Sequence, residues 1–138
     1  MRMLSAAVVG IALLWASVPL AAHHSFAAEF DENKPVTLRG TLTKMAWTNP
    51  HGWLYVDVKD ADGKVVNWAI EMGAPNALIR RGITKNTVPI GAELTVEGFA
   101  AKDGSATANG RTLRMADGRA LFAGSSNTGA PGDPRPTP

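Results

Sequence analysis

Runs of alternating apolar and polar residues dominate this chain, and the order in which they occur is the strongest constraint on its fold. In the first run, apolar or small residues from Val36 to Leu42 alternate with polar ones, which is typical of a half-buried β-strand. The large apolar positions then move by one place, to Met45 and Trp47. A slip of this kind, with Gly40 close by, indicates a bulge that bends a long strand.

Two further strands and a short helix follow the turn at Asn49–Gly52. The alternation predicts strands over Trp53–Lys59 and Val65–Met72, joined by a hairpin that carries the strong turn signal Asp-Gly. The next segment, Pro75–Arg81, begins with a proline that suits a first helical turn and is followed by Gly82, which suits a helix end. We therefore predict a helix of about two turns there.

The remaining strands complete the pattern that selects the fold. Val88–Leu94 leads into a fourth strand that runs to Phe99, and a hairpin is expected around Asp117-Gly118. Three strands, one helix and then two or three strands is the order of the five-stranded barrel called the OB-fold. We predict a mainly β protein over residues 36–124: a small OB-fold-like barrel of five to six strands, with one short helix between strands 3 and 4. A sandwich of short strands is the alternative, but the position of the helix favours the barrel.

Residues 1–22 have the three parts of a secretory signal peptide. Met1–Met3 gives a positive start, Leu4–Val18 is almost entirely apolar, and Pro19–Ala22 ends in small residues. An uncleaved anchor is the alternative, because the stretch is almost long enough to span a bilayer. The Ala- and Gly-rich middle favours cleavage. We therefore expect a periplasmic or secreted protein with no stable membrane insertion after cleavage.

The segments that flank the predicted barrel lack a sustained period. Residues 23–35 mix small, acidic and aromatic residues, so we interpret them as an N-terminal arm. Residues 125–138 are rich in Ser, Asn, Gly and Pro, a composition that cannot build a core, and we predict a disordered tail.

Composition excludes several functional classes. The chain has no cysteine, so it has no disulfide, thiolate ligand or cysteine nucleophile. Its net charge is +2 and its basic residues are scattered, which argues against nucleic-acid binding. It has no Gly-rich phosphate loop and no Gly-x-Ser-x-Gly motif. An enzyme is therefore the weakest interpretation, and within it we consider a copper-dependent oxidase or oxygenase.

The three histidines of the chain fall in two places. His23 and His24 would be the first residues after cleavage, and His51 lies in the turn after the first strand. An N-terminal histidine can chelate an ion through its α-amine and its imidazole, and His51 would add a second imidazole. His24 is either a third imidazole or a bystander. Such nitrogen ligands suit Cu(II). We predict a copper site from His23, His24 and His51; the alternative is that they are ordinary polar residues.

A second hypothesis needs no metal. Trp53 and Tyr55 occupy one face of the second strand and are a possible ligand face for a peptide, a glycan or an envelope partner, because exposed aromatics on OB barrels stack on ligands. Trp47 and Trp68 belong to the same aromatic set, and packing is the alternative for all four residues. Glu71, in the third strand, is either a buried carboxylate near the metal site or a surface residue.

The chain also resembles an uncharacterised family of small exported bacterial proteins, domain-of-unknown-function family 6152. The resemblance is carried by Ala22–Phe26 with Glu29–Asp31, Trp47–His51, Val65–Trp68, Pro75–Leu78 and Val96–Gly98 with Lys102–Gly104. It implies a stand-alone periplasmic or secreted domain and brings no established activity or cofactor. The chain departs from the family pattern at Gly52, where a larger apolar residue is common, and we expect this glycine to loosen the turn that holds His51.

Overall fold

The computed structural model describes residues 26–125 and 130–132. The elements are the helices α2 (Phe26–Glu29) and α3 (Pro75–Arg80) and the strands β1 (Phe30–Ala46), β2 (Trp53–Lys59), β3 (Val65–Glu71), β4 (Glu93–Ala101), β5 (Thr107–Met115) and β6 (Ala120–Phe122).

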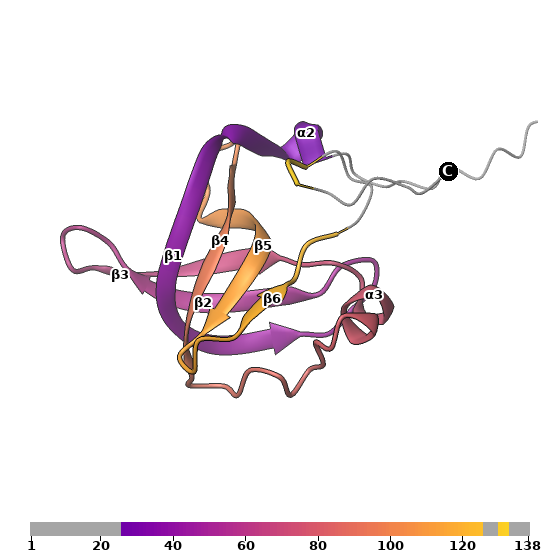
Figure 1. Cartoon of the computed structure of the whole chain (residues 1–138). Coiled ribbons are helices and arrows are strands. Elements are labelled where there is room, and N and C mark those ends of the chain that lie inside the picture. The colour runs from indigo at the N-terminus through magenta and orange to yellow at the C-terminus, as the bar shows by residue number, and fades with distance from the viewer. Residues whose placement is uncertain (1–25, 126–129, 133–138) are drawn as a thin grey trace, which may run out of the picture.

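The strands close into a ring, which Figure 1 shows from the side. The sheet order is β3-β2-β1-β4-β5-β6, and β3 also pairs with β5, in parallel, through Ala69–Glu71 and Thr107–Asn109. Five strands therefore form the barrel, and β6 extends the sheet beside β5. Along the chain, α3 comes between β3 and β4. The predicted mainly β, OB-like barrel is confirmed, together with its helix between strands 3 and 4.

The long strand β1 bends and pairs with strands in both halves of the barrel. Its first part pairs with β4 and its last part pairs with β2, with a register shift between Leu42 and Lys44 that is the predicted bulge. Gly40 lies where β2 and β4 both pair with β1. A Cβ atom there would lie 2.1 Å from the main-chain oxygen of Asp57, so only glycine permits this close approach.

The core fills the barrel with side chains from the strands, at alternate positions in the first part of β2, and from α3 and the segment after it. Among its members, Leu42, Leu54, Ile70 and Leu113 have no exposed surface. A second, smaller apolar cluster lies against α2 and consists of Phe26, Phe30, Ala101 and Ala130. The chain holds its fold through this burial and the strand pairing, since it has no cysteine to cross-link.

Both ends of the barrel domain differ from the sequence-based boundaries. We expected the first strand to begin at Val36, but β1 begins at Phe30, which is buried and pairs with Ala101 of β4. The exposed residues Glu32–Lys34 interrupt the alternation, so the sequence pattern does not reveal this start. At the other end, Ser125 and Ala130 of the segment that we expected to be disordered are both buried, and residues 126–129 and 133–138 lie outside the described part.

The predicted signal peptide, residues 1–22, lies outside the described residues. Within the described ranges, 26–125 and 130–132, no helix combines the length and apolar character needed to cross a membrane.

The close approach at Gly40 predicts a large effect of a single methyl group. We expect Gly40→Ala to lower the free energy of unfolding by about 1–3 kcal/mol or more, because the added Cβ overlaps a main-chain atom that cannot move aside easily. Urea unfolding followed by tryptophan fluorescence measures this. Thr37→Ala, at an exposed position of the same strand, is the control. Equal unfolding midpoints for the two variants would contradict the prediction.

Candidate functional site

The loop between β1 and β2 carries His51 and is fastened to the end of β3. The amide of Gly52 donates to the carbonyl of Gly73 at 3.0 Å, and the amide of Met72 donates to the carbonyl of Gly52 at 2.8 Å. The Thr48 hydroxyl donates to the His51 carbonyl at 3.1 Å. Gly52 was expected to loosen this turn, yet both of its peptide groups are bonded and it is buried.

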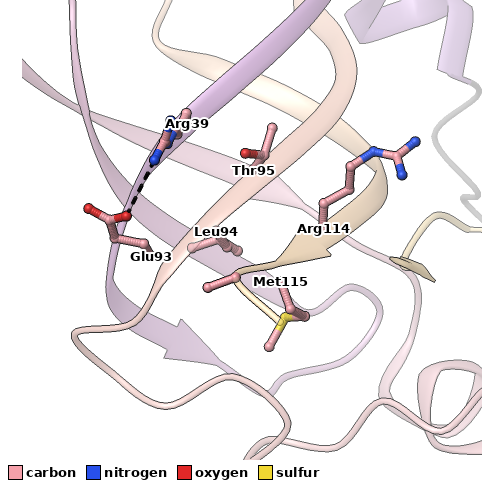
Figure 2. Close-up of a pocket in the computed structure, with 7 residues that line it drawn as sticks. Arg39, Glu93, Leu94, Thr95, Arg114 and Met115 are labelled. Atoms are coloured by element: carbon pink, nitrogen blue, oxygen red, sulfur yellow. Dashed lines mark ion pairs between the residues drawn. The ribbon is translucent and has the colours of Figure 1, made fainter. Parts of the chain in front are cut away.

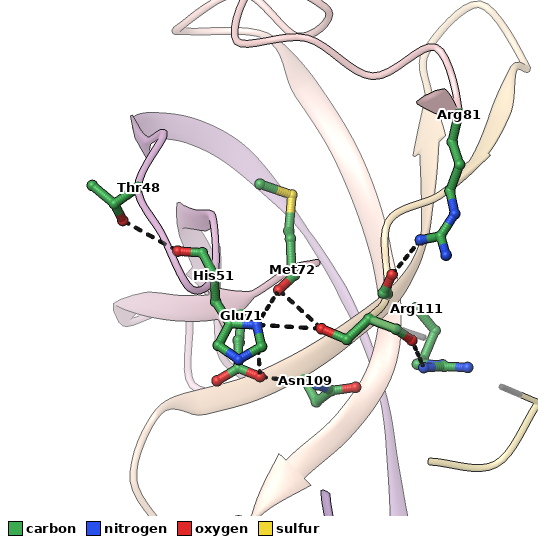
Figure 3. A network of polar contacts seen from close by, with 9 residues as sticks. Thr48, His51, Glu71, Met72, Arg81, Asn109 and Arg111 are labelled. Carbon is green, nitrogen blue, oxygen red and sulfur yellow. Dashed lines mark hydrogen bonds and ion pairs between the residues drawn. The ribbon is translucent and has the colours of Figure 1, made fainter. Parts of the chain in front are cut away.

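The imidazole of His51 points one nitrogen inward, toward three oxygen atoms (Figure 3). Its Nδ1 lies 3.1 Å from the carbonyl oxygen of Met72, 3.3 Å from the Ser125 hydroxyl and 3.9 Å from Oε1 of Glu71. A carbonyl oxygen only accepts hydrogen bonds, so the neutral ring carries its proton on Nδ1 and its lone pair on Nε2. Within the described residues Nε2 has no hydrogen-bond partner.

Glu71 is a buried carboxylate beside this histidine, with 8% of its surface exposed. It lies between the core residues Ile70 and Met72, so its side chain leaves the opposite side of the strand. Asn109, its register partner on β5, is 2% exposed and donates from Nδ2 to Glu71 Oε1 over 3.4 Å. The parallel pairing that closes the barrel thus also places a carboxylate and an amide side by side.

The segment after β6 completes the surroundings of His51. Two arginines donate to its carbonyl oxygens: Arg81 reaches Gly124 at 2.5 Å and Arg111 reaches Ser125 at 3.5 Å. Their guanidinium carbons lie 4.7 and 4.8 Å from the centre of the Phe122 ring. The same segment brings the Ser125 hydroxyl to 3.3 Å from Nδ1 of His51.

Of the predicted metal ligands, only His51 lies in the described part of the chain. His23 and His24 lie outside it, so their position relative to His51 is not described. Among residues 26–125 and 130–132, no group of three or more histidine, cysteine or acidic side chains is arranged to hold a metal ion.

The two aromatic residues of the predicted ligand face lie on one side of β2. Trp53 and Tyr55 are half-buried, alternate with the core residues Leu54 and Val56, and therefore share the outer side of the strand. The Lys44 ammonium lies 5.1 Å from the centre of the Tyr55 ring. Trp47 and Trp68, by contrast, pack against the barrel core.

Sequence reasoning found part of this site and missed the rest. His51 was singled out, and Glu71 was considered as a buried carboxylate near it, which is where the structure places it. Asn109, Ser125 and the Met72 carbonyl were missed. Ser125 lies in a polar tail and a main-chain carbonyl has no sequence signature, so only the tertiary fold reveals them.

A groove on another part of the barrel is a weaker candidate for a functional site. It has a volume of about 260 Å³ and is lined by exposed parts of β1, β4 and β5 (Figure 2). Arg39 lies 3.6 Å from Glu93, and Arg114 lies 2.8 Å from Glu97. The hydrogen bond to Glu97 raises the pKa of Arg114. Because these exposed charges pair with each other, the surroundings of His51 are the stronger candidate site.

Comparison with known families agrees with the resemblance read from the sequence. The model of a family described only as being of unknown function matches residues 11–110, which is more than half of the chain. This chain belongs to family DUF6152. The range that matches DUF6152 includes all three histidines and Glu71. No match was found among the curated proteins or among the solved structures.

The contacts of His51 predict its tautomer. We expect the neutral ring to carry its proton on Nδ1, because the Met72 carbonyl oxygen at 3.1 Å accepts from that nitrogen. Side-chain ¹⁵N NMR of the metal-free protein separates protonated from unprotonated ring nitrogens, and a His51→Gln sample identifies the signals. A proton found on Nε2 at neutral pH would contradict the prediction.

Proposed function

We propose that this protein is an exported periplasmic binding protein that holds one copper ion. His23, as the mature N-terminal residue, supplies its α-amine and its imidazole, and His51 supplies a facing imidazole through Nε2. His24 is either a further imidazole or a bystander. The proposal requires signal cleavage after Ala22, which creates the free amine of His23.

The observation that carries this proposal is the way in which His51 is held. Metal-binding histidines usually donate their other ring N–H to a carbonyl or carboxylate, which fixes the tautomer and directs the ligating lone pair. The Nδ1 atom of His51 lies 3.1 Å from a main-chain carbonyl, with Glu71 close by at 3.9 Å. The side chain is only 15% exposed, so the ring is held in one orientation.

The length of the chain supports the assembly of the site. Ser125 contacts His51, and Ala130 belongs to the cluster around Phe26, so five residues, or at most about 18 Å of chain, join the two places. His23 precedes Phe26 by three residues, which span at most about 11 Å. The side chains of His23 and His51 add to this length. The reach of His23 from Phe26 is then comparable to the length of chain that separates Ser125 from Ala130.

The donor set supports copper over other ions. An amine and two or three imidazoles give only nitrogen ligands, and Cu(II) binds such sets most strongly among the divalent first-row metals. The chain has no cysteine, so no thiolate competes to make a zinc or iron–sulfur site. An exported protein would meet copper outside the cytoplasm.

A native mass spectrum of the protein exported to the periplasm, before and after one equivalent of Cu(II), tests the proposal. We expect a mass that begins at His23 and one copper retained against a weak competitor. His23→Ala and His51→Ala should each weaken the affinity at least about tenfold, because each removes a ligand. Lys59→Ala, at an exposed strand end, is the control, and His24→Ala shows whether His24 is a ligand.

Two results would overturn the copper proposal. One is a mature protein that begins elsewhere or retains no copper. The other is an affinity that stays the same when His23 and His51 are both replaced by alanine.

The outer face of β2 favours a second candidate, a metal-free interaction module. OB domains bind ligands on the face formed by strands 2 and 3 and by the loop between strands 1 and 2. Trp53 and Tyr55 lie on that strand, half-buried and on one side. Such a surface would hold a peptide, a glycan or an envelope partner by stacking.

The module hypothesis predicts a partner that depends on Trp53 and not on metal. A pull-down from envelope extracts should lose this partner on Trp53→Ala and keep it with a chelator present. Thr37→Ala, at an exposed position in the part of β1 that pairs with β4, is the control. A partner that persists with Trp53→Ala, or that disappears with the chelator, would contradict this hypothesis.

A further inference from the structure

We infer that the outer side of β2 and β3 binds an uncharged oligosaccharide with an extended, β-1,4-linked chain. The inference rests on the second candidate function, the metal-free interaction module, and it deepens that function by naming one class of ligand. It requires neither a metal ion nor any residue outside the described ranges.

The pairing of β2 with β3 collects aromatic and polar side chains on one side of the sheet. Trp53, Tyr55 and Asp57 alternate with core residues along β2, so all three point away from the core. Asp57 is the register partner of Asn67 on β3. Tyr55 is the register partner of Ala69, whose small side chain leaves room beside the ring. The two aromatic rings and the polar pair therefore form one row along the strand.

The polar end of this row is a small hydrogen-bonded cluster. Asn67 Nδ2 donates to Asp57 Oδ1 at 2.8 Å and to Thr43 Oγ1 at 3.1 Å. The Thr43 hydroxyl in turn donates to the carbonyl of Tyr55 at 3.0 Å. Because a carboxylate only accepts hydrogen bonds, the amide of Asn67 is oriented with its nitrogen toward Asp57. Within the described residues, no donor is bonded to Asn67 Oδ1 or to Asp57 Oδ2, so the cluster presents two free acceptors and no spare N–H.

This combination of groups matches the two surfaces of a sugar ring. The C–H groups on the face of a sugar pack on aromatic rings, and the hydroxyl groups at its edge donate to acceptors. Hydrogen bonds to an ionised carboxylate are about twice as strong as those between neutral groups. A phosphate or carboxylate ligand would bring further acceptors and negative charge next to Asp57, so an anion is disfavoured.

The charges around the row balance, which favours an uncharged ligand. The Lys44 ammonium lies 5.1 Å from the centre of the Tyr55 ring and opposes a second cation at that place. Lys59 follows Asp57 by two positions on the same strand and is exposed. These two cations offset the carboxylate of Asp57 and the buried carboxylate of Glu71.

The row leads into a groove that gives an extended ligand room beyond the two rings. The groove has a volume of about 260 Å³ and is lined by Arg39, Gly40, Thr41, Asp57, Lys59 and Glu93. Asp57 belongs to both the row and the groove. From Trp53 to Asp57 the row extends over about 14 Å. A chain of several sugars fits this length better than a single ring does.

Strand pairing argues against a peptide at the same place. Peptides often bind a sheet by adding a strand to a free edge. The part of β2 that carries the rings is paired with β1 on one side and with β3 on the other. Residues Ala69–Glu71 of β3 are in turn paired with β5. The ligand is therefore held by side chains.

Isothermal titration calorimetry of the exported protein, with a chelator present, tests the inference. The probes are cellohexaose and chitohexaose, which are uncharged and β-1,4-linked. Maltohexaose has the same sugar as cellohexaose in an α-linked, coiled chain, deacetylated chitohexaose is cationic, and a galacturonate hexamer is anionic. We expect cellohexaose or chitohexaose to bind more tightly than the other three.

Variants then assign the binding to the row. Trp53→Ala should raise the dissociation constant about fivefold or more, as loss of a stacking ring does elsewhere, and Trp53→Phe should retain most of the affinity. Asp57→Ala should raise the constant about tenfold, because a hydrogen bond to a charged group is lost. Asp62→Ala, at an exposed aspartate of the β2–β3 hairpin turn, is the matched control and should bind like the wild type. Thermal unfolding checks that each variant is folded.

Three results would overturn the inference: neither cellohexaose nor chitohexaose binds, a charged or α-linked hexamer binds more tightly, or the affinity is unchanged in both Trp53→Ala and Asp57→Ala. If no sugar binds but the pull-down from envelope extracts still yields a partner that depends on Trp53, the interaction module stands and this inference alone fails. If neither a sugar nor such a partner is found, both fail.

Discussion

The parallel pairing of β3 with β5 is the contact on which both the barrel and the candidate site depend. It joins Ala69–Glu71 to Thr107–Asn109 and turns a sheet with two open edges into a ring. Parallel neighbours need a long connection, and here the connection contains α3 and all of β4. The same three residue pairs place Glu71 beside Asn109, so the closure of the barrel and the buried polar contact cannot be separated.

This closure explains why a buried carboxylate can persist in a small domain without disulfides. A charge taken out of water is costly unless polar partners surround it. Glu71 has the amide of Asn109 and the ring of His51 nearby, and the His51 loop is in turn fastened by the two hydrogen bonds between Gly52 and the residues after β3. Each partner comes from a different part of the chain. The polar contacts therefore form only when the whole barrel has formed.

Much of the fold could be predicted from the sequence, because strands with one buried face show alternation. β2 was placed at its observed bounds, and the slip at Met45 located the bulge of β1. The start of β1 was missed because Glu32–Lys34 are exposed and polar. The packing of Ala130 was missed because a small residue in a Pro- and Gly-rich segment carries no signal of burial. Local patterns report which face is buried, and they do not report which distant segment covers it.

The candidate site also depends on contacts between distant segments, which local sequence patterns do not report. His51 could be singled out because histidine is rare in this chain and chemically distinctive, whereas the atom closest to its Nδ1 is the main-chain oxygen of Met72. That oxygen is supplied by the path of the backbone and is independent of the side chain at that position. Substitutions at Glu71 or Ser125 alter the charge and the hydrogen bonding around the ring, but they leave this acceptor in place. The backbone thus sets the orientation of the imidazole, and the neighbouring side chains set the charge and the hydrogen bonding around it.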